Sequence, residues 1–196
     1  MHRRHFLVGL GAAGSALVAA PAFALNEASA SDLINRLVAD INTVIASGKG
    51  EGAMYGDFER IFERYSDTSY IAAYAMGVDA RRASAAQKNA FSDAFQKYIA
   101  RKYGSRFREF IGGRLEVTGV KQVKKWYEVS CVAYLRGQSP FEVTFHVSDR
   151  SGRDLFFNMF IEGVNLLLTE RTEIGAMIDR NSGDLDKMIA DLKALS

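Results

Sequence analysis

The first half of the chain repeats apolar residues at helical spacing. Between Ser31 and Ser47 they recur every three or four positions, which predicts one amphipathic helix, and the glycine-rich residues 48–50 end it. Asp57 is expected to cap a short second helix, because its side chain can accept a hydrogen bond from a free backbone N–H. Residues 70–76 predict a third short helix.

A long helix is expected to begin at Ser84. The sequence Ser84-Ala-Ala-Gln87 is typical of a capping box, in which each of the two side chains bonds the backbone N–H of the other residue. The helix is expected to end near Ile111, because Gly112-Gly113 follows. Ordinary core packing is the simplest interpretation of the aromatic residues on one side of it, which are Phe91, Phe95, Tyr98, Tyr103, Phe107 and Phe110.

The second half of the chain changes to the two-residue period of strands. Apolar and polar residues alternate, or run apolar, in about five segments separated by turn residues, which predicts strands joined mostly by hairpins: 114–123, 126–136, 141–148, 153–162 and 164–169. Two helices, 170–180 and 184–195, are expected to close the chain. Helices followed by an antiparallel sheet and further helices form an α+β layout, with the sheet curved and covered by helices.

The alternation also predicts which side chains face the core. In strand 141–148 the apolar residues, Phe145 among them, are expected to point inward, and those expected to face water are Glu142, Thr144, His146 and Ser148. Strand 155–161 is apolar on both sides and should therefore lie centrally. One side is expected to carry Leu155, Phe157, Met159 and Ile161, and the other Phe156 and Phe160. Glu162 and Gly163 are expected to shape a bulge or a strand turn.

Residues 1–24 have the pattern of a cleaved export signal. A charged start precedes an apolar stretch, residues 6–20, and Ala22-Phe23-Ala24 fits a small-x-small cleavage site. Arg3-Arg4, followed by Phe and Leu, favours the twin-arginine route over the general secretory one. A retained anchor is the alternative, although the stretch is shorter than the ~20 residues of a membrane span. The mature chain, residues 25–196, is then expected to be one domain in the periplasm.

Composition and charge exclude several classes of protein. The chain has 196 residues, 48% of them hydrophobic, as in folded soluble proteins. One cysteine and three histidines provide neither an internal disulfide nor a zinc cluster, so no metal or cofactor is expected. Removal of Arg3 and Arg4 lowers the 25 basic residues to 23, equal to the 23 acidic ones. A neutral mature chain is a poor partner for nucleic acid.

Few residues suggest catalysis. His146 is the only histidine beyond residue 24, and its place at a polar strand position favours a solvated sheet residue over a general base. No nucleophile-elbow, phosphate-loop or dinucleotide-binding sequence stands at the necessary structural position. No catalytic residue is therefore assigned, and the chain is not expected to be an enzyme.

Two segments carry a family resemblance. The first, 155–171, is similar to the pattern D-V-x-V-E-G-V-S-L-V-x-x-x-R-x-x-F at Glu162, Gly163, Val164 and Arg171, with substitutions at Asn158, Asn165 and, further on, Ile174. The second, 84–95 with the later Tyr103, is similar to S-x-x-Q-x-x-x-F-x-x-x-F and a following tyrosine. With the export signal and the order of elements, the chain resembles the MlaC (toluene-tolerance) family of periplasmic phospholipid-binding proteins. The substitutions are also compatible with a divergent branch, such as the hopanoid-associated relatives.

The resemblance implies a non-enzymatic lipid carrier with an NTF2-like fold and a lipid cavity between helices and sheet. Its partners would be an outer-membrane lipoprotein complex and an inner-membrane ABC transporter with an MCE-domain subunit, and its role the maintenance of outer-membrane lipid asymmetry. Phospholipid would be cargo, not a cofactor. The resemblance makes eleven residues candidates to line the cavity: Phe91, Phe95, Tyr98, Tyr103, Phe107, Phe145, Phe157, Met159, Ile161, Val164 and Leu166. An NTF2-like small-molecule enzyme and a protein-binding envelope scaffold stay open as alternatives.

Overall fold

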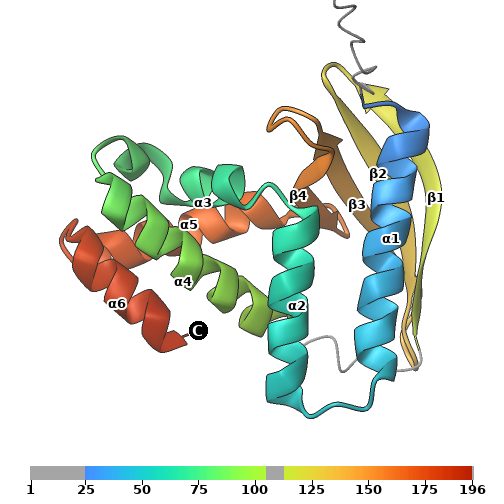
Figure 1. Ribbon diagram of the computed structural model, residues 1–196, viewed down its shortest axis with the longest axis horizontal. Helices are drawn as coiled ribbons and strands as arrows, with labels where there is room; N and C mark the ends of the chain where they lie inside the picture. The colour runs from blue at the N-terminus through green and yellow to red at the C-terminus, as the bar shows by residue number, and fades with distance from the viewer. Residues whose placement is uncertain (1–24, 105–112, 196) are drawn as a thin grey trace, which may run out of the picture.

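The expected order of helices, sheet and helices is confirmed. The computed structural model describes residues 25–104 and 113–195, so the export-signal pattern and Phe107 lie outside the described residues. Figure 1 shows the elements, which are α1 (Glu27–Ala46), α2 (Glu51–Tyr65), α3 (Thr68–Met76), the 3-10 helix η1 (Gly77–Arg81), α4 (Ala85–Gly104), β1 (Arg114–Val123), β2 (Trp126–Tyr134), β3 (Phe141–Ser148), β4 (Leu155–Ile161), β5 (Val164–Asn165), α5 (Leu166–Arg180) and α6 (Leu185–Leu195). Within the described ranges, no helix combines the length and apolar character needed to cross a bilayer.

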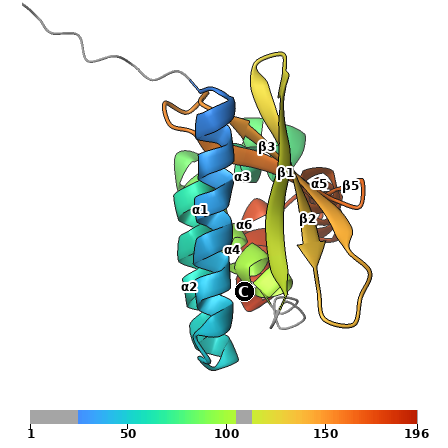
Figure 2. The same ribbon diagram turned by 90° about the vertical axis from the view of Figure 1, so that its right-hand side faces the viewer.

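The five strands form one open, antiparallel sheet in chain order. Helix α1 lies along one face of β1 and β2, and Figure 2 shows α1 and α2 together on that side of the strands. Helices α3 and α5 contact the strand β4 near the other edge. The sheet is therefore covered by helices, as the strand pattern predicts.

The remaining helices form a helical lobe beside the sheet. Figure 1 shows α3, α4, α5 and α6 in this lobe, with α2 standing between α4 and the strands. The packing partners of α4 are α2, α3 and α6. The resemblance implies that aromatic residues of α4 and residues of the strands line one cavity, but in this structure α4 packs against α2, which lies between α4 and the strands.

One of the two predicted helix caps is present in the structure. Ser84 and Gln87 form the expected capping box, with Gln87 N donating to Ser84 Oγ at 3.1 Å and Ser84 N to Gln87 Oε1 at 3.0 Å. The prediction that Asp57 caps a helix is wrong. This residue lies inside α2, buried, where it pairs with Lys49 at 2.7 Å and with Arg60. The hydrogen bond from Lys49 lowers the pKa of Asp57.

The end of the sheet differs from the predicted strand 164–169. Strand β5 ends at Asn165, and α5 begins at Leu166, because the Asn165 side chain caps the helix by accepting from Leu168 N at 3.1 Å. The expected turn at Glu162 and Gly163 is confirmed, since Ile161 pairs with Val164 and both turn residues have positive φ, 49° and 79°.

A β-bulge in β4 changes the predicted faces of that strand. His146 pairs with Asn158, but the next residue, Val147, pairs with Phe156, so Phe157 is the extra residue. Phe156 consequently shares a face with Val147, and the expectation that Phe157 shares a face with Met159 is wrong. An alternating pattern does not reveal such a bulge, because the shift depends on pairing with the neighbouring strand.

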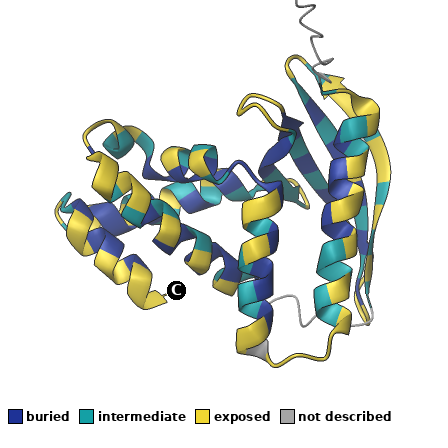
Figure 3. Cartoon of the chain, viewed as in Figure 1, coloured by how far each residue is buried: buried dark blue, intermediate teal, exposed yellow. Residues whose placement is uncertain are grey.

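The hydrophobic core lies where the helices meet the covered face of the sheet. Figure 3 shows buried residues on the inward sides of α1 and α2 and along the strands behind them. From α1 this core receives Ala30, Leu33, Ile34, Leu37 and Val38. The same hydrophobic cluster continues into the helical lobe through α4, α5 and α6, so the lobe and the sheet share one core.

Candidate functional site

The covered face of the sheet is an apolar wall, called the inner face here. Strand pairing brings its members into adjacent rows: Phe145 lies opposite Met159 and Val143 opposite Ile161. Phe145 and Val143 are buried, whereas Met159 and Ile161 are half-buried and pack against the core. Further members of the inner face are Val129, Cys131, Ala133, Val147 and Phe156.

Helix α2 contacts the inner face at Phe156. The Phe62 ring meets that of Phe156 edge-on at 6.0 Å between centroids, and Phe156 in turn meets Phe145 at 5.6 Å. On its other side α2 touches the end of α4, where a Cβ added to Gly104 would lie only 3.0 Å from Tyr55 and 3.2 Å from Phe58. The aromatic residues of α2 and Phe156 were not among the predicted lining residues, because helical spacing identifies a buried side without identifying its partner.

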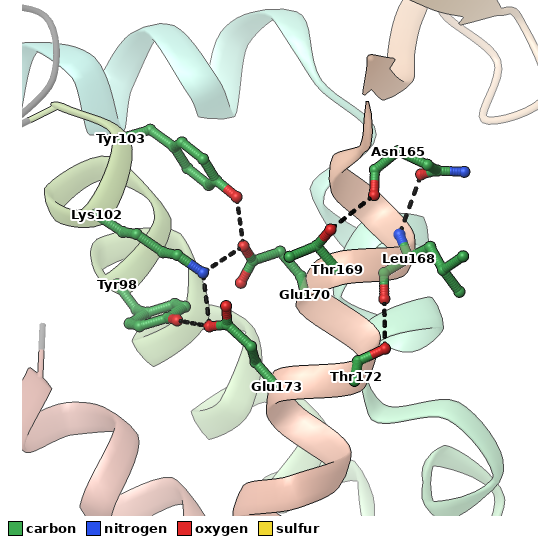
Figure 4. A network of polar contacts seen from close by, with 9 residues as sticks. All are labelled: Tyr98, Lys102, Tyr103, Asn165, Leu168, Thr169, Glu170, Thr172 and Glu173. Carbon is green, nitrogen blue, oxygen red and sulfur yellow. Dashed lines mark hydrogen bonds and ion pairs between the residues drawn. The ribbon is translucent and has the colours of Figure 1, made fainter. Parts of the chain in front are cut away.

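A polar cluster joins α4 to α5 beside this apolar interior, and it is called the α4–α5 cluster here. It consists of Tyr98, Lys102, Tyr103, Glu170 and Glu173 (Figure 4). Lys102 Nζ donates to Glu170 Oε1 at 2.7 Å and to Glu173 Oε2 at 2.6 Å. The Tyr103 hydroxyl donates to Glu170 Oε1 at 2.5 Å, and the Tyr98 hydroxyl to Glu173 Oε2 at 2.7 Å. One ammonium and two phenol groups thus donate hydrogen bonds to the two glutamate side chains.

The electrostatics of the α4–α5 cluster favour its charged form. Burial opposes the charge on Lys102, but hydrogen bonds to Glu170, Glu173 and Tyr98 outweigh it and raise the pKa of Lys102. Burial also works against the Glu173 carboxylate, yet hydrogen bonds from Lys102 and Tyr98 hold its pKa below the ordinary value. Burial, helped by Glu173, raises the pKa of Tyr98 to about 12. Near neutral pH the Lys102 ammonium therefore lies beside the Glu173 carboxylate and the protonated Tyr98 phenol.

The predicted lining residues lie in several separate regions of the structure. Phe145, Met159 and Ile161 share the inner face, and Tyr98 and Tyr103 belong to the α4–α5 cluster. The others lie elsewhere: Phe91 and Phe95, stacked at 5.3 Å inside the helical lobe; Phe157, on the outer face of the sheet; Val164, 55% exposed at the sheet edge; and Leu166, half-buried at the start of α5. The described candidates thus do not form one continuous wall.

His146 lies in an aromatic cluster on the outer face of the sheet. Its ring is 4.8 Å from that of Phe160, 5.7 Å from Phe157 and 6.1 Å from Trp126, measured between centroids. The interpretation as a solvated residue is wrong, because the bulge at Phe157 and the ring of Trp126 cover it. Burial lowers the pKa of His146, against a smaller opposite effect of Glu128 at 3.5 Å. The imidazole is therefore neutral near pH 7 and packs as an aromatic ring.

The motif residues of segment 155–171 have definite structural places. Asn158 is buried, and its side-chain oxygen accepts from Leu167 N at 3.3 Å, which ties β4 to the first turn of α5. The Arg171 guanidinium lies 5.0 Å from the centroid of Tyr74 and within 3.5 Å of where a Cβ on Gly77 would stand. These contacts fasten α5 to the sheet and to the turn after α3.

Two clefts on the described surface lie away from these residues. One, of about 290 Å³, is formed between α4 and α6 around Gln87, Asp186 and Lys193; the other, of about 270 Å³, is formed between α1 and α2 around Asp40 and Asp57. Each is slightly smaller than the ~300 Å³ at which pockets for drug-sized ligands begin, and neither is lined by the inner face. The residues described include no group of three potential metal ligands placed to hold an ion.

Comparisons with known proteins agree with this architecture. A family model described as MlaC protein matches residues 31–194. The fold is similar to the solved structure of a phospholipid-binding protein from Ralstonia solanacearum in complex with a phospholipid, with a TM-score of 0.69 and 16% sequence identity. The similarity covers 83% of this chain and 98% of that one. At this identity it establishes a shared fold.

Proposed function

The chain belongs to the MlaC family, and on that premise we propose that it binds phospholipid and carries it across the periplasm. The family match over residues 31–194 is the observation that carries the proposal. The shared fold supports it, since the structure from Ralstonia solanacearum contains a phospholipid. In this proposal residues 1–24 are removed on export, by the twin-arginine or the general secretory route. The carrier exchanges lipid with an outer-membrane lipoprotein complex and an inner-membrane MCE-type ABC transporter, and so maintains outer-membrane lipid asymmetry.

The inner face supplies the apolar environment that such a cargo requires. Each buried methylene is worth ~0.8 kcal/mol, so the two tails of one phospholipid need a continuous apolar wall. Phe145, Met159 and Ile161 form part of such a wall on the sheet, and Phe156 on the same face meets Phe62 of α2. The acyl chains insert between Phe62 and Phe156, so α2 and the sheet move apart when lipid binds. Acyl methylenes then pack against both surfaces, which keeps the aromatic rings in an apolar environment.

A small-molecule enzyme would need a buried acid or base within reach of a substrate. Glu170 is a buried carboxylate, and one of its oxygens already accepts from Lys102 and from the candidate lining residue Tyr103. The α4–α6 and α1–α2 clefts lie away from this carboxylate. This arrangement favours an ion pair that connects two helices over a general base, and it supports a binding protein.

Lipid transfer between vesicles tests the proposal. Protein lacking residues 1–24 is mixed with donor vesicles that contain a fluorescent phospholipid and with unlabelled acceptors, and we expect transfer in proportion to protein concentration. Ile161→Glu places a charge on the half-buried inner face and should reduce transfer at least about tenfold, since a carboxylate against acyl chains is costly. Thr144 lies on the neighbouring strand and faces the outer side of the sheet. Thr144→Glu is therefore the matched control and should transfer lipid at the wild-type rate.

Transfer no faster than that between vesicles alone would contradict the carrier function. An envelope scaffold that binds only protein would give that result. Equal loss of transfer in both variants would contradict the assignment of the inner face as the lipid wall, because the charge would then act without regard to the face it occupies.

A further inference from the structure

The α4–α5 cluster has the composition of a binding site for an ammonium group. Lys102 Nζ lies 5.3 Å from the centroid of the Tyr98 ring and 5.5 Å from that of Tyr103, within the range of cation–π attraction. The two carboxylates bind the same Nζ, as Figure 4 shows. The aromatic rings and acids therefore form a cage, and the protein's own lysine shows which charge the cage accepts.

The cluster also has an acceptor that the described residues do not use. Glu170 is only 3% exposed; its Oε1 accepts from Lys102 and Tyr103, but its Oε2 is buried and has no hydrogen-bond partner among the described residues. A buried carboxylate oxygen without a donor is unfavourable, and a ligand N–H would satisfy it. Among the described residues of the cluster, two carboxylates also face one ammonium, which is an arrangement that a second, ligand-borne cation would suit.

The position of the cluster suits the headgroup of an amphiphile. Exposure of the side chains rises from 4% for Glu170 through 27% for Lys102 to 44% for Glu173, so the cluster extends from the protein interior to solvent. At its inner end Tyr103 packs against the hydrophobic core, and α5 starts directly at the sheet edge that carries Ile161. A molecule with apolar tails against the inner face can thus place its polar end at this rim.

From these observations we infer that the α4–α5 cluster selects phospholipids whose headgroup carries an amine, an inference that rests on the proposed lipid binding. The headgroup ammonium meets Glu170 and Glu173, and the phosphate pairs with Lys102. A zwitterionic headgroup therefore finds both charges complemented. An anionic headgroup without an amine offers no donor to the buried Oε2 of Glu170 and adds a negative charge beside Glu173.

Competitive extraction from mixed vesicles tests this inference. Protein lacking residues 1–24 is incubated with vesicles of equal parts phosphatidylethanolamine and phosphatidylglycerol with identical acyl chains, reisolated, and its lipid quantified by mass spectrometry. We expect about fivefold enrichment of phosphatidylethanolamine, which corresponds to about 1 kcal/mol. Glu173→Gln should reduce the enrichment to below about twofold. Asp179→Asn removes the same charge from an exposed site on α5 and should keep the wild-type ratio.

The outcomes separate this inference from the function on which it rests. Bound lipid in the ratio of the vesicles, or an unchanged ratio in the Glu173→Gln variant, would overturn headgroup selection while leaving lipid binding intact. Absence of any bound lipid would overturn the proposed function itself. The wild-type ratio needs no variant, so the inference can be refuted even if a substitution prevents folding.

Discussion

Replacement of Lys102 by methionine is expected to lower the free energy of unfolding, because it breaks the ion pairs of the α4–α5 cluster. Lys102 gives the cluster its only ammonium, with ion pairs of 2.7 Å to Glu170 and 2.6 Å to Glu173. Methionine keeps much of the length and apolar character of the lysine stem but removes the charge. Among the described residues, the Glu170 carboxylate, whose side chain is 4% exposed, then keeps the Tyr103 hydroxyl as a donor.

The expected cost follows from the burial of the two partners. Removal of one partner of a fully buried ion pair costs about 3–5 kcal/mol, because the other charge stays in a poor solvent. Lys102 is 27% exposed and Glu173 44% exposed, so water screens part of the loss. We therefore expect the free energy of unfolding to fall by about 2 kcal/mol. The double variant Lys102→Met, Glu170→Gln should recover part of this, since no unpaired charge remains buried.

Urea unfolding followed by circular dichroism measures the effect. The matched control is Lys97→Met, which removes an exposed lysine of the same helix and should change the free energy of unfolding by less than about 0.5 kcal/mol. A loss at Lys102 no larger than that at Lys97 would refute the view that the cluster stabilises the fold. Failure of the double variant to recover any stability would refute the unpaired Glu170 carboxylate as the cause.

Three further outcomes follow from single residues. Gly77→Ala should lower the free energy of unfolding by about 1–2 kcal/mol in urea titrations, because φ is 62° and the new Cβ would stand 3.3 Å from the Arg171 guanidinium. Although burial opposes it, hydrogen bonding holds the pKa of Glu173 below 4.5, so its stabilisation is present above about pH 4.5 and lost as pH falls further. Glu173→Gln should make the free energy of unfolding depend less on pH below about pH 4.5, and the difference from the wild type should be less than about 1 kcal/mol. Burial raises the pKa of Cys131 to about 12, so a chromogenic thiol reagent should react with it only after unfolding; rapid reaction of the folded protein would contradict its burial.

Features specified by neighbouring residues were predictable from the sequence. The capping box at Ser84 and Gln87 and the turn at Glu162 and Gly163 depend on hydrogen bonds or backbone angles within a few residues. The α+β order follows equally from the change of hydrophobic period along the chain. These elements appear in the structure close to where the patterns place them.

Features set by contacts distant in sequence were not predictable in the same way. The bulge at Phe157 exchanges the faces of β4, and it exists only through pairing with β3. The early start of α5 depends on Asn165 and on the more distant Asn158, both of which also fit a strand pattern. The aromatic stripe of α4 identified a buried side correctly, but nothing in its spacing shows that α2 separates it from the sheet.

The candidate site shows the same division. Aromatic periodicity identified Tyr98 and Tyr103, whereas their polar partners Glu170 and Glu173 lie about 70 residues later in a separate helix. Spacing on each helix is compatible with one shared cluster, since Tyr98 and Lys102 are four residues apart and the two glutamates three. Only the packing of α4 beside α5 brings the two pairs together.

Native mass spectrometry of the mature protein, purified from the exporting cell under mild conditions, tests lipid carriage most directly. We expect a protein mass increased by one phospholipid, and an adduct that dissociates into a lipid with two acyl chains. Protein that is consistently empty, and that stays empty after incubation with phospholipid vesicles, would contradict the carrier function.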